Sequence, residues 1–115
     1  MASDAGAVAK LNELVADAES LVVSALTVTE VRRVLANDGD LRAFDDAMDD
    51  VSVVPFDRQG ARRAADLLRR LDHDGSPIGA VDAMIGATAL ERNEKVLTRN
   101  VSEFDRIDGL RVVPY

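Results

Sequence analysis

The chain has 115 residues, which suffice for one compact domain that buries roughly two thirds of its unfolded surface, and leave no room for a second. Its 21 acidic and 14 basic residues give a formal charge of −7, which repels phosphate backbones and argues against non-specific nucleic-acid binding. The absence of cysteine excludes disulfides, thiolate metal sites and cysteine nucleophiles. No run is long and apolar enough for a membrane span or a signal peptide, so the sequence predicts a soluble cytoplasmic protein.

Apolar periodicity switches repeatedly between the helical and strand types along the chain. Asp4, Thr27, Asp40 and Asp57 are capping residues at predicted helix starts, and Gly75 closes the helix that Asp57 opens. In chain order we expect a helix from 4 to about 19, a strand over 21–24, a helix from 27 to near 37–39, a helix after residue 40 that contains 41–48, and a strand over 51–54. A helix from 57 closed by residue 75 and the helix that carries Asp82 follow. The chain then forms a strand over 95–98, a helical turn over 101–105 and a last strand over 110–113.

Strands separated by helices imply right-handed crossovers and parallel pairing. Such a sheet is covered by helices on both faces. The sequence therefore predicts an α/β fold in which a parallel sheet is flanked by two layers of helices, in a single domain over residues 1–115.

Three acids share one local pattern, in which a capping-type residue precedes the acid by three positions. The segments are Thr27-Val-Thr-Glu30, Gly79-Ala-Val-Asp82 and Asn100-Val-Ser-Glu103. Each acid is expected at the third helical position, where it satisfies unpaired N–H groups and the helix dipole, and this structural role alone explains any one of them. Asp82 is the most informative, because an ionised group in an otherwise apolar helix is costly unless something binds it.

Convergence of the three acids would give them a function. Helix starts that follow strands of a parallel sheet lie at its carboxyl edge, where ligands bind. Glu30 and Glu103 each follow a strand directly, whereas Asp82 follows a helix. Three carboxylates without cysteine or histidine would form an oxygen-rich site for a hard cation, Mg²⁺ or Mn²⁺.

The blocks 24–30, 77–90 and 97–104, with Gly109-Leu-Arg-Val after them, resemble the PIN-domain endoribonuclease toxins of the VapC group. The resemblance implies a PIN-like fold of three layers, a Mg²⁺-dependent cut in RNA, a protein antitoxin and a homodimer. It also implies that Glu30, Asp82 and Glu103 are the catalytic and metal-binding acids. Thr98 and Asn100 match the strand-end residues that support the family's site.

The chain departs from the family pattern at its start. The family begins with a central hydrophobic strand that carries a metal-binding aspartate, whereas Met1-Ala-Ser-Asp4 leads directly into a helix. We hypothesise that a short N-terminal strand is missing, which would leave a gap in the sheet. The alternative is a catalytically inactive PIN remnant that acts as an antitoxin-binding module.

Other polar groups favour structural explanations. Arg62 and Arg63 are repeated seven residues on by Arg69 and Arg70, so the pairs lie on similar helix faces and could contact RNA phosphates. A solvated face is the favoured interpretation, because no aromatic residues interleave for base stacking. His73 lies among turn residues and is interpreted as an exposed loop residue. A response-regulator receiver fold shares the α/β alternation but expects an early acid cluster that this chain lacks.

Overall fold

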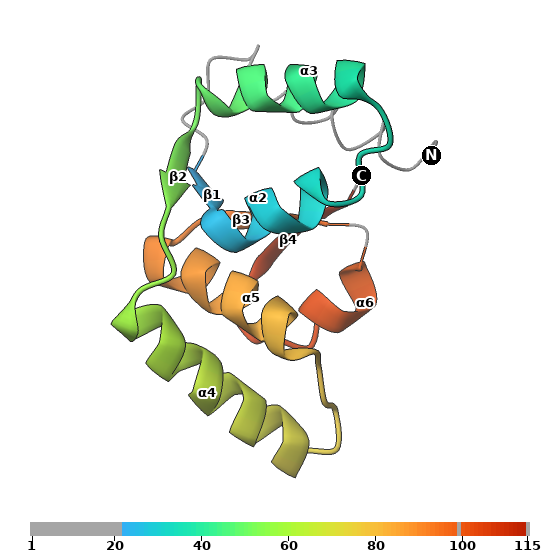
Figure 1. The fold of residues 1–115 in the computed structure, drawn as a ribbon. Helices are drawn as coiled ribbons and strands as arrows, with labels where there is room; N and C mark the ends of the chain where they lie inside the picture. Colours follow the sequence, from blue (N-terminus) through green and yellow to red (C-terminus); the bar gives the residue numbers. More distant parts are fainter. Residues whose placement is uncertain (1–21, 99, 115) are drawn as a thin grey trace. The chain divides into compact units, whose positions relative to one another are not determined.

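The computed structural model describes residues 22–98 and 100–114, in two compact units formed by residues 1–54 and 55–115 (Figure 1). Each unit is described by itself, and the predicted helix over 4–19 lies outside the described residues. No helix in the described part of the chain is long and apolar enough to cross a membrane. The elements of the first unit are β1 (Val22–Ser24), α2 (Ala25–Arg32), α3 (Asp38–Met48) and β2 (Ser52–Val54), and those of the second are α4 (Arg58–His73), α5 (Ala80–Arg92), β3 (Lys95–Thr98), α6 (Val101–Phe104) and β4 (Arg111–Pro114).

The four strands found among residues 22–98 and 100–114 form two parallel pairs, one in each unit. β1 pairs with β2, with Val22 opposite Ser52, and β3 pairs with β4, with Lys95 opposite Arg111. The prediction of an α/β fold with parallel strands joined through helices is confirmed, because each pair is linked by a helical crossover.

Helix α2 begins earlier than predicted. Ser24, the last residue of β1, is the N-cap, and its hydroxyl oxygen accepts a hydrogen bond from the backbone N–H of Leu26 at 3.1 Å. A serine at the end of a strand lets the helix start at once, so Thr27 lies inside the first turn and does not cap it. The helix also ends at Arg32, before the predicted residues 37–39, where short bonds such as Val34 N–H to Val31 C=O tighten its end.

Helix α3 begins at Asp38 and is capped by Asn37, whereas the sequence analysis assigned the cap to Asp40. The Asn37 side-chain oxygen accepts from Asp40 N–H at 2.8 Å, and its amide donates to the Asp40 carboxylate at 3.1 Å. Asp40 therefore supplies the acidic partner of a reciprocal cap. Phe44 is 1% exposed and packs with Leu35 and Ala47 as the core of this unit.

Helices α4 and α5 pack side by side in opposite directions and form the framework of the second unit (Figure 1). Asp57 caps α4 as predicted, and its carboxylate accepts from Gly60 N–H at 2.9 Å. The helix closes at Gly75, whose φ of +75° suits glycine. The predicted apolar stripe is buried at Ala64, Leu67 and Leu71, half-buried at Leu68 and exposed at Ala61.

The loop after α4 turns the chain back to start α5. Ser76 N–H donates to Leu71 C=O at 2.9 Å and Gly75 N–H to Asp72 C=O at 3.2 Å, the two bonds of a Schellman motif. Ile78 is buried, and Gly79 is the N-cap of α5. The start of α5 is thus held by its own loop and by the short segment that follows β3.

Candidate functional site

Asp82 lies in the first turn of α5 at the third helical position, as predicted. The N-cap, Gly79, has no side chain to satisfy the first N–H groups, so the acid at this position complements the helix start. Beyond Asp82 nearly every residue of the helix middle is buried, from Ala83 and Ile85 to Ala89. Asp82 itself is half-buried and is the only charged residue in the first two turns of α5.

The second acid comes from the turn after β3. Thr98 ends the strand, is buried, and accepts the backbone N–H of Asn100 on its hydroxyl oxygen at 2.9 Å. This bond fixes the turn that starts α6, where Asn100 is the N-cap and Glu103 the third helical residue. The predicted position of Glu103 is therefore confirmed.

Asn100 joins the two acids. Its side chain makes no cap bond to α6, and its amide nitrogen donates to Asp82 Oδ2 at 3.2 Å and to a Glu103 carboxylate oxygen. Two carboxyl groups 21 positions apart in the chain thus meet around one amide group. We call Asp82 and Glu103 the acid pair, and the side chain of Asn100 its bridging amide.

The pKa of Glu103 lies below its ordinary value. The largest cause is the hydrogen bond with Asp82, followed by the bond from Asn100, the backbone N–H of Gly79 and the charge of Arg106, while partial burial opposes them. Hydrogen bonds to the charged form keep this carboxylate ionised, which is the state that a cation requires.

Gly86 leaves room on α5 for the segment that follows α6. It lies one turn after Asp82 on the same face of α5. A Cβ at this position would be 2.6 Å from Ile107 Cδ1 and 3.6 Å from Leu110 Cδ2, so an alanine here would require the end of the Ile107 side chain to shift. Ile107 is 2% exposed, which shows how closely that segment packs on α5. The sequence analysis did not identify this role for Gly86.

Glu30 does not have the position that the sequence predicted. Because α2 begins at Ala25, no acid occupies its first turn, and Glu30 lies in the last turn of the helix, half-buried. It belongs to the first unit, whereas Asp82 and Glu103 belong to the second. Among residues 22–98 and 100–114, no group of three or more Asp, Glu, His or Cys side chains is close enough together to hold a metal ion.

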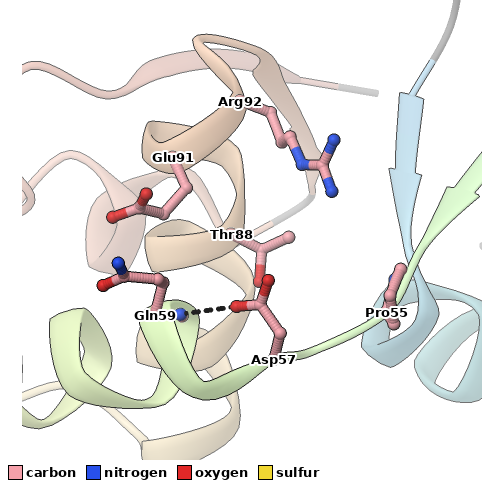
Figure 2. A pocket seen from close by; sticks show the side chains of 7 residues that line it. Pro55, Asp57, Gln59, Thr88, Glu91 and Arg92 are labelled. Carbon is pink, nitrogen blue, oxygen red and sulfur yellow. Dashed lines mark hydrogen bonds between the residues drawn. The ribbon is translucent and has the colours of Figure 1, made fainter.

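A separate pocket of about 230 Å³ lies where the start of α4 meets the end of α5 (Figure 2). Three of its polar side chains, those of Asp57, Thr88 and Glu91, make contacts within the fold. Asp57 caps α4, the Thr88 hydroxyl donates to Met84 C=O at 2.8 Å, and Glu91 pairs with Arg63 at 2.9 Å. The pocket is therefore a surface hollow between two helix ends, and the acid pair is the stronger candidate site.

The charged residues of α4 lie outside both places. All of its arginines are exposed, and Arg63 is held by Glu91, which agrees with the interpretation of a solvated face. His73 ends α4 and is exposed, as expected, although it belongs to the last helical turn and not to the loop.

Comparison with known proteins identifies the family. The model of the PIN domain matches residues 2–110. A VapC ribonuclease, Y4jK, of Sinorhizobium fredii is 35% identical over 105 residues, covering 83% of this chain and 74% of the relative. The tRNA(fMet)-specific endonuclease VapC of Salmonella typhimurium is 29% identical over 96 residues, covering 80% of this chain and 73% of the relative.

Solved structures agree with this assignment. The crystal structure of DNA-bound VapBC from Salmonella typhimurium superimposes with a TM-score of 0.69 and 29% identity, covering 81% of this chain and 74% of that one. VapBC-1 from nontypeable Haemophilus influenzae gives a TM-score of 0.70 at 26% identity, covering 89% and 84%. The chain belongs to the PIN-domain family, within its VapC group.

Proposed function

We propose that this protein is a Mg²⁺- or Mn²⁺-dependent endoribonuclease, the toxin of a toxin–antitoxin pair, and that Asp82 and Glu103 bind the cation. The observation that carries the proposal is the acid pair, two carboxyl groups brought together by one amide on the fold of a nuclease family. The relatives named as an endonuclease and a ribonuclease support the class of reaction.

The donor set fits a hard divalent cation. Carboxylate oxygens are the ligands that Mg²⁺ and Mn²⁺ prefer, and Mg²⁺ in nucleotide-processing enzymes is commonly held by one or two carboxylates, with water and substrate phosphate at its other positions. Two carboxylates therefore suffice for this type of site.

The residues of the chain have distinct parts in the proposed reaction. A bound cation would polarise the scissile phosphate and lower the pKa of the attacking water. Asp82 and Glu103 would hold the cation, and Asn100 would orient both carboxylates through its amide. Thr98 would keep Asn100 in place through its bond to the backbone. The sequence-based assignment of Glu30 as a further metal-binding acid stays a prediction.

The partners follow the same proposal. The substrate would be RNA, with tRNA(fMet) the first to test because it is the named target of the Salmonella relative. The neighbouring solved structures are VapBC assemblies, which supports a cognate antitoxin as protein partner. We further propose a homodimer in the cytoplasm.

The test combines metal binding with cleavage. We expect heat on calorimetric titration with Mn²⁺, and cleavage of a tRNA(fMet) transcript in Mg²⁺ that stops on adding EDTA. A chain that cleaved equally well in EDTA would contradict the metal mechanism. A chain that gave no heat and no cleavage but bound its antitoxin would instead be the non-catalytic interaction module, a candidate that the absence of a three-acid group among the described residues favours.

A further inference from the structure

Arg106 connects the two helix starts at a point next to the acid pair. Its guanidinium donates to the carbonyl oxygen of Pro77, a residue 29 positions earlier in the loop before α5. Arg106 lies three residues after Glu103, in the turn that follows the end of α6 at Phe104. Its own backbone N–H donates to Glu103 C=O at 3.1 Å, which ties it to that turn.

The same loop also lies close to Glu103. The backbone N–H of Gly79 is among the groups that lower the pKa of the Glu103 carboxyl group. Glu103 and Arg106 thus meet the loop at two points, where Arg106 donates to the Pro77 carbonyl and Glu103 lies near the Gly79 amide. Ile78, between them, is 8% exposed and anchors the loop in the core.

This double contact matters because nothing in the N-cap side chain holds the start of α5. Gly79 has no side chain for a cap bond, and Asp82 Oδ2 lies 3.8 Å from the position that a Gly79 Cβ would take. Any movement of Pro77 and Gly79 away from α6 therefore also moves Asp82 relative to Glu103. The positive charge of Arg106 near Glu103 also favours the ionised form of that carboxyl group and lowers its pKa.

We propose that Arg106 is a positioning residue of the acid pair. By its hydrogen bond to Pro77, Arg106 holds the α4–α5 loop and so keeps Asp82 against Asn100 and Glu103; we call this contact the clasp. The inference rests on the proposed function for its consequence, the binding of a cation. The clasp itself is a property of the metal-free chain.

The test compares Arg106→Met, which keeps the length of the side chain but removes its charge and donors, with Arg69→Met as control. Arg69 is also exposed, and in the described part of the chain it makes no ion pair. In the metal-free protein we expect amide exchange at Gly79 to become about tenfold faster in the first variant and to stay unchanged in the second. Arg106→Lys keeps a charge and a donor, and we expect it to restore most of the protection.

The second readout is the affinity for Mn²⁺ by calorimetry, which we expect Arg106→Met to weaken by roughly tenfold, as supporting partners of metal ligands do. The clasp would be overturned if the Gly79 amide exchanged in Arg106→Met at the same rate as in the parent protein. It would also be overturned if the Gly79 amide exchanged in Arg106→Lys as fast as in Arg106→Met. If the parent chain bound no Mn²⁺, the proposed function would fail, while the Gly79 exchange rates would still decide the clasp. Parental Mn²⁺ affinity in Arg106→Met would overturn the positioning role.

Discussion

Helices α4 and α5 of the second unit differ in where their charged side chains lie. All charged residues of α4, including its five arginines, point into solvent, opposite a buried stripe of Ala64, Leu67 and Leu71. Helix α5 is buried over most of its middle and has one charged residue near its start, Asp82, which other elements contact. Apart from Arg63, which pairs with Glu91, the charges on α4 therefore need no explanation beyond solvation, whereas Asp82 on α5 is placed by its contact with another element.

The strongest test of this contrast removes one carboxylate charge from each helix. We expect Asp82→Asn to reduce RNA cleavage by more than about 100-fold, because a direct ligand should cost more than the roughly 10–100-fold typical of supporting partners. Asp66→Asn, the matched change on the exposed face of α4, should leave the cleavage rate unchanged. Steady-state cleavage assays on folded variants measure both. If both variants lost RNA cleavage activity equally, or if neither lost any, the distinction between the charges of α4 and α5 would be wrong.

The next test removes Asn100, the hydrogen-bond partner that distinguishes Asp82 from the solvated acids of α4. Asn100→Ala deletes the amide that bridges Asp82 and Glu103, so we expect Mn²⁺ affinity to fall roughly 10–100-fold in a calorimetric titration. Ser102→Ala, an exposed position in the same turn, is the control and should bind Mn²⁺ as the parent does. If the two variants bound Mn²⁺ equally, the amide bridge would have no part in the site.

A third test concerns packing, with the same substitution in each helix. Gly60→Ala in α4 places a Cβ 3.4 Å from Phe56, in ordinary contact, and gains helix propensity, whereas Gly86→Ala in α5 places one 2.6 Å from Ile107. We expect Gly86→Ala to be less stable than Gly60→Ala by roughly 1–2 kcal/mol in urea unfolding, because overpacking opposes the same gain. Equal unfolding free energies would mean that Ile107 moves aside freely and that Gly86 does not set the approach of α5 and α6.

The smallest expected effect is a pH dependence of stability. The folded-state pKa of Glu103 lies below its ordinary value of 4.5, so its ionisation stabilises the fold above about pH 4.5 and this contribution is lost as pH falls through the lower folded-state pKa. The difference in unfolding free energy between the parent and Glu103→Gln should therefore narrow over that range. Because the carboxylate is largely solvated, the change is small. A difference that widened on acidification would contradict the direction of the shift.

Local signals in the sequence predicted the second unit well. Asp57 and Gly75 bound α4 as expected, β3 has its predicted limits, and both Asp82 and Glu103 occupy third helical positions. Each of these features depends on residues within a few positions, so the sequence contains the information. The same type of signal failed at Glu30, because Ser24 lies closer to the strand end than Thr27 and caps α2 first.

The sequence by itself determined the parallel α/β architecture and the presence of acids at two helix starts, since capping and periodicity are local properties. Only the tertiary structure decided that Asn100 turns its amide away from its own helix to join those acids, that Gly86 lets the segments approach, and that Arg106 reaches Pro77. Apart from the Asn100–Glu103 bond, which spans three positions, these contacts connect residues from 18 to 29 positions apart, with the Asp82–Asn100 and Pro77–Arg106 bonds as the limits. They arise only when α5 and the α6 turn pack together, because packing and not local preference chooses the partner of each polar group.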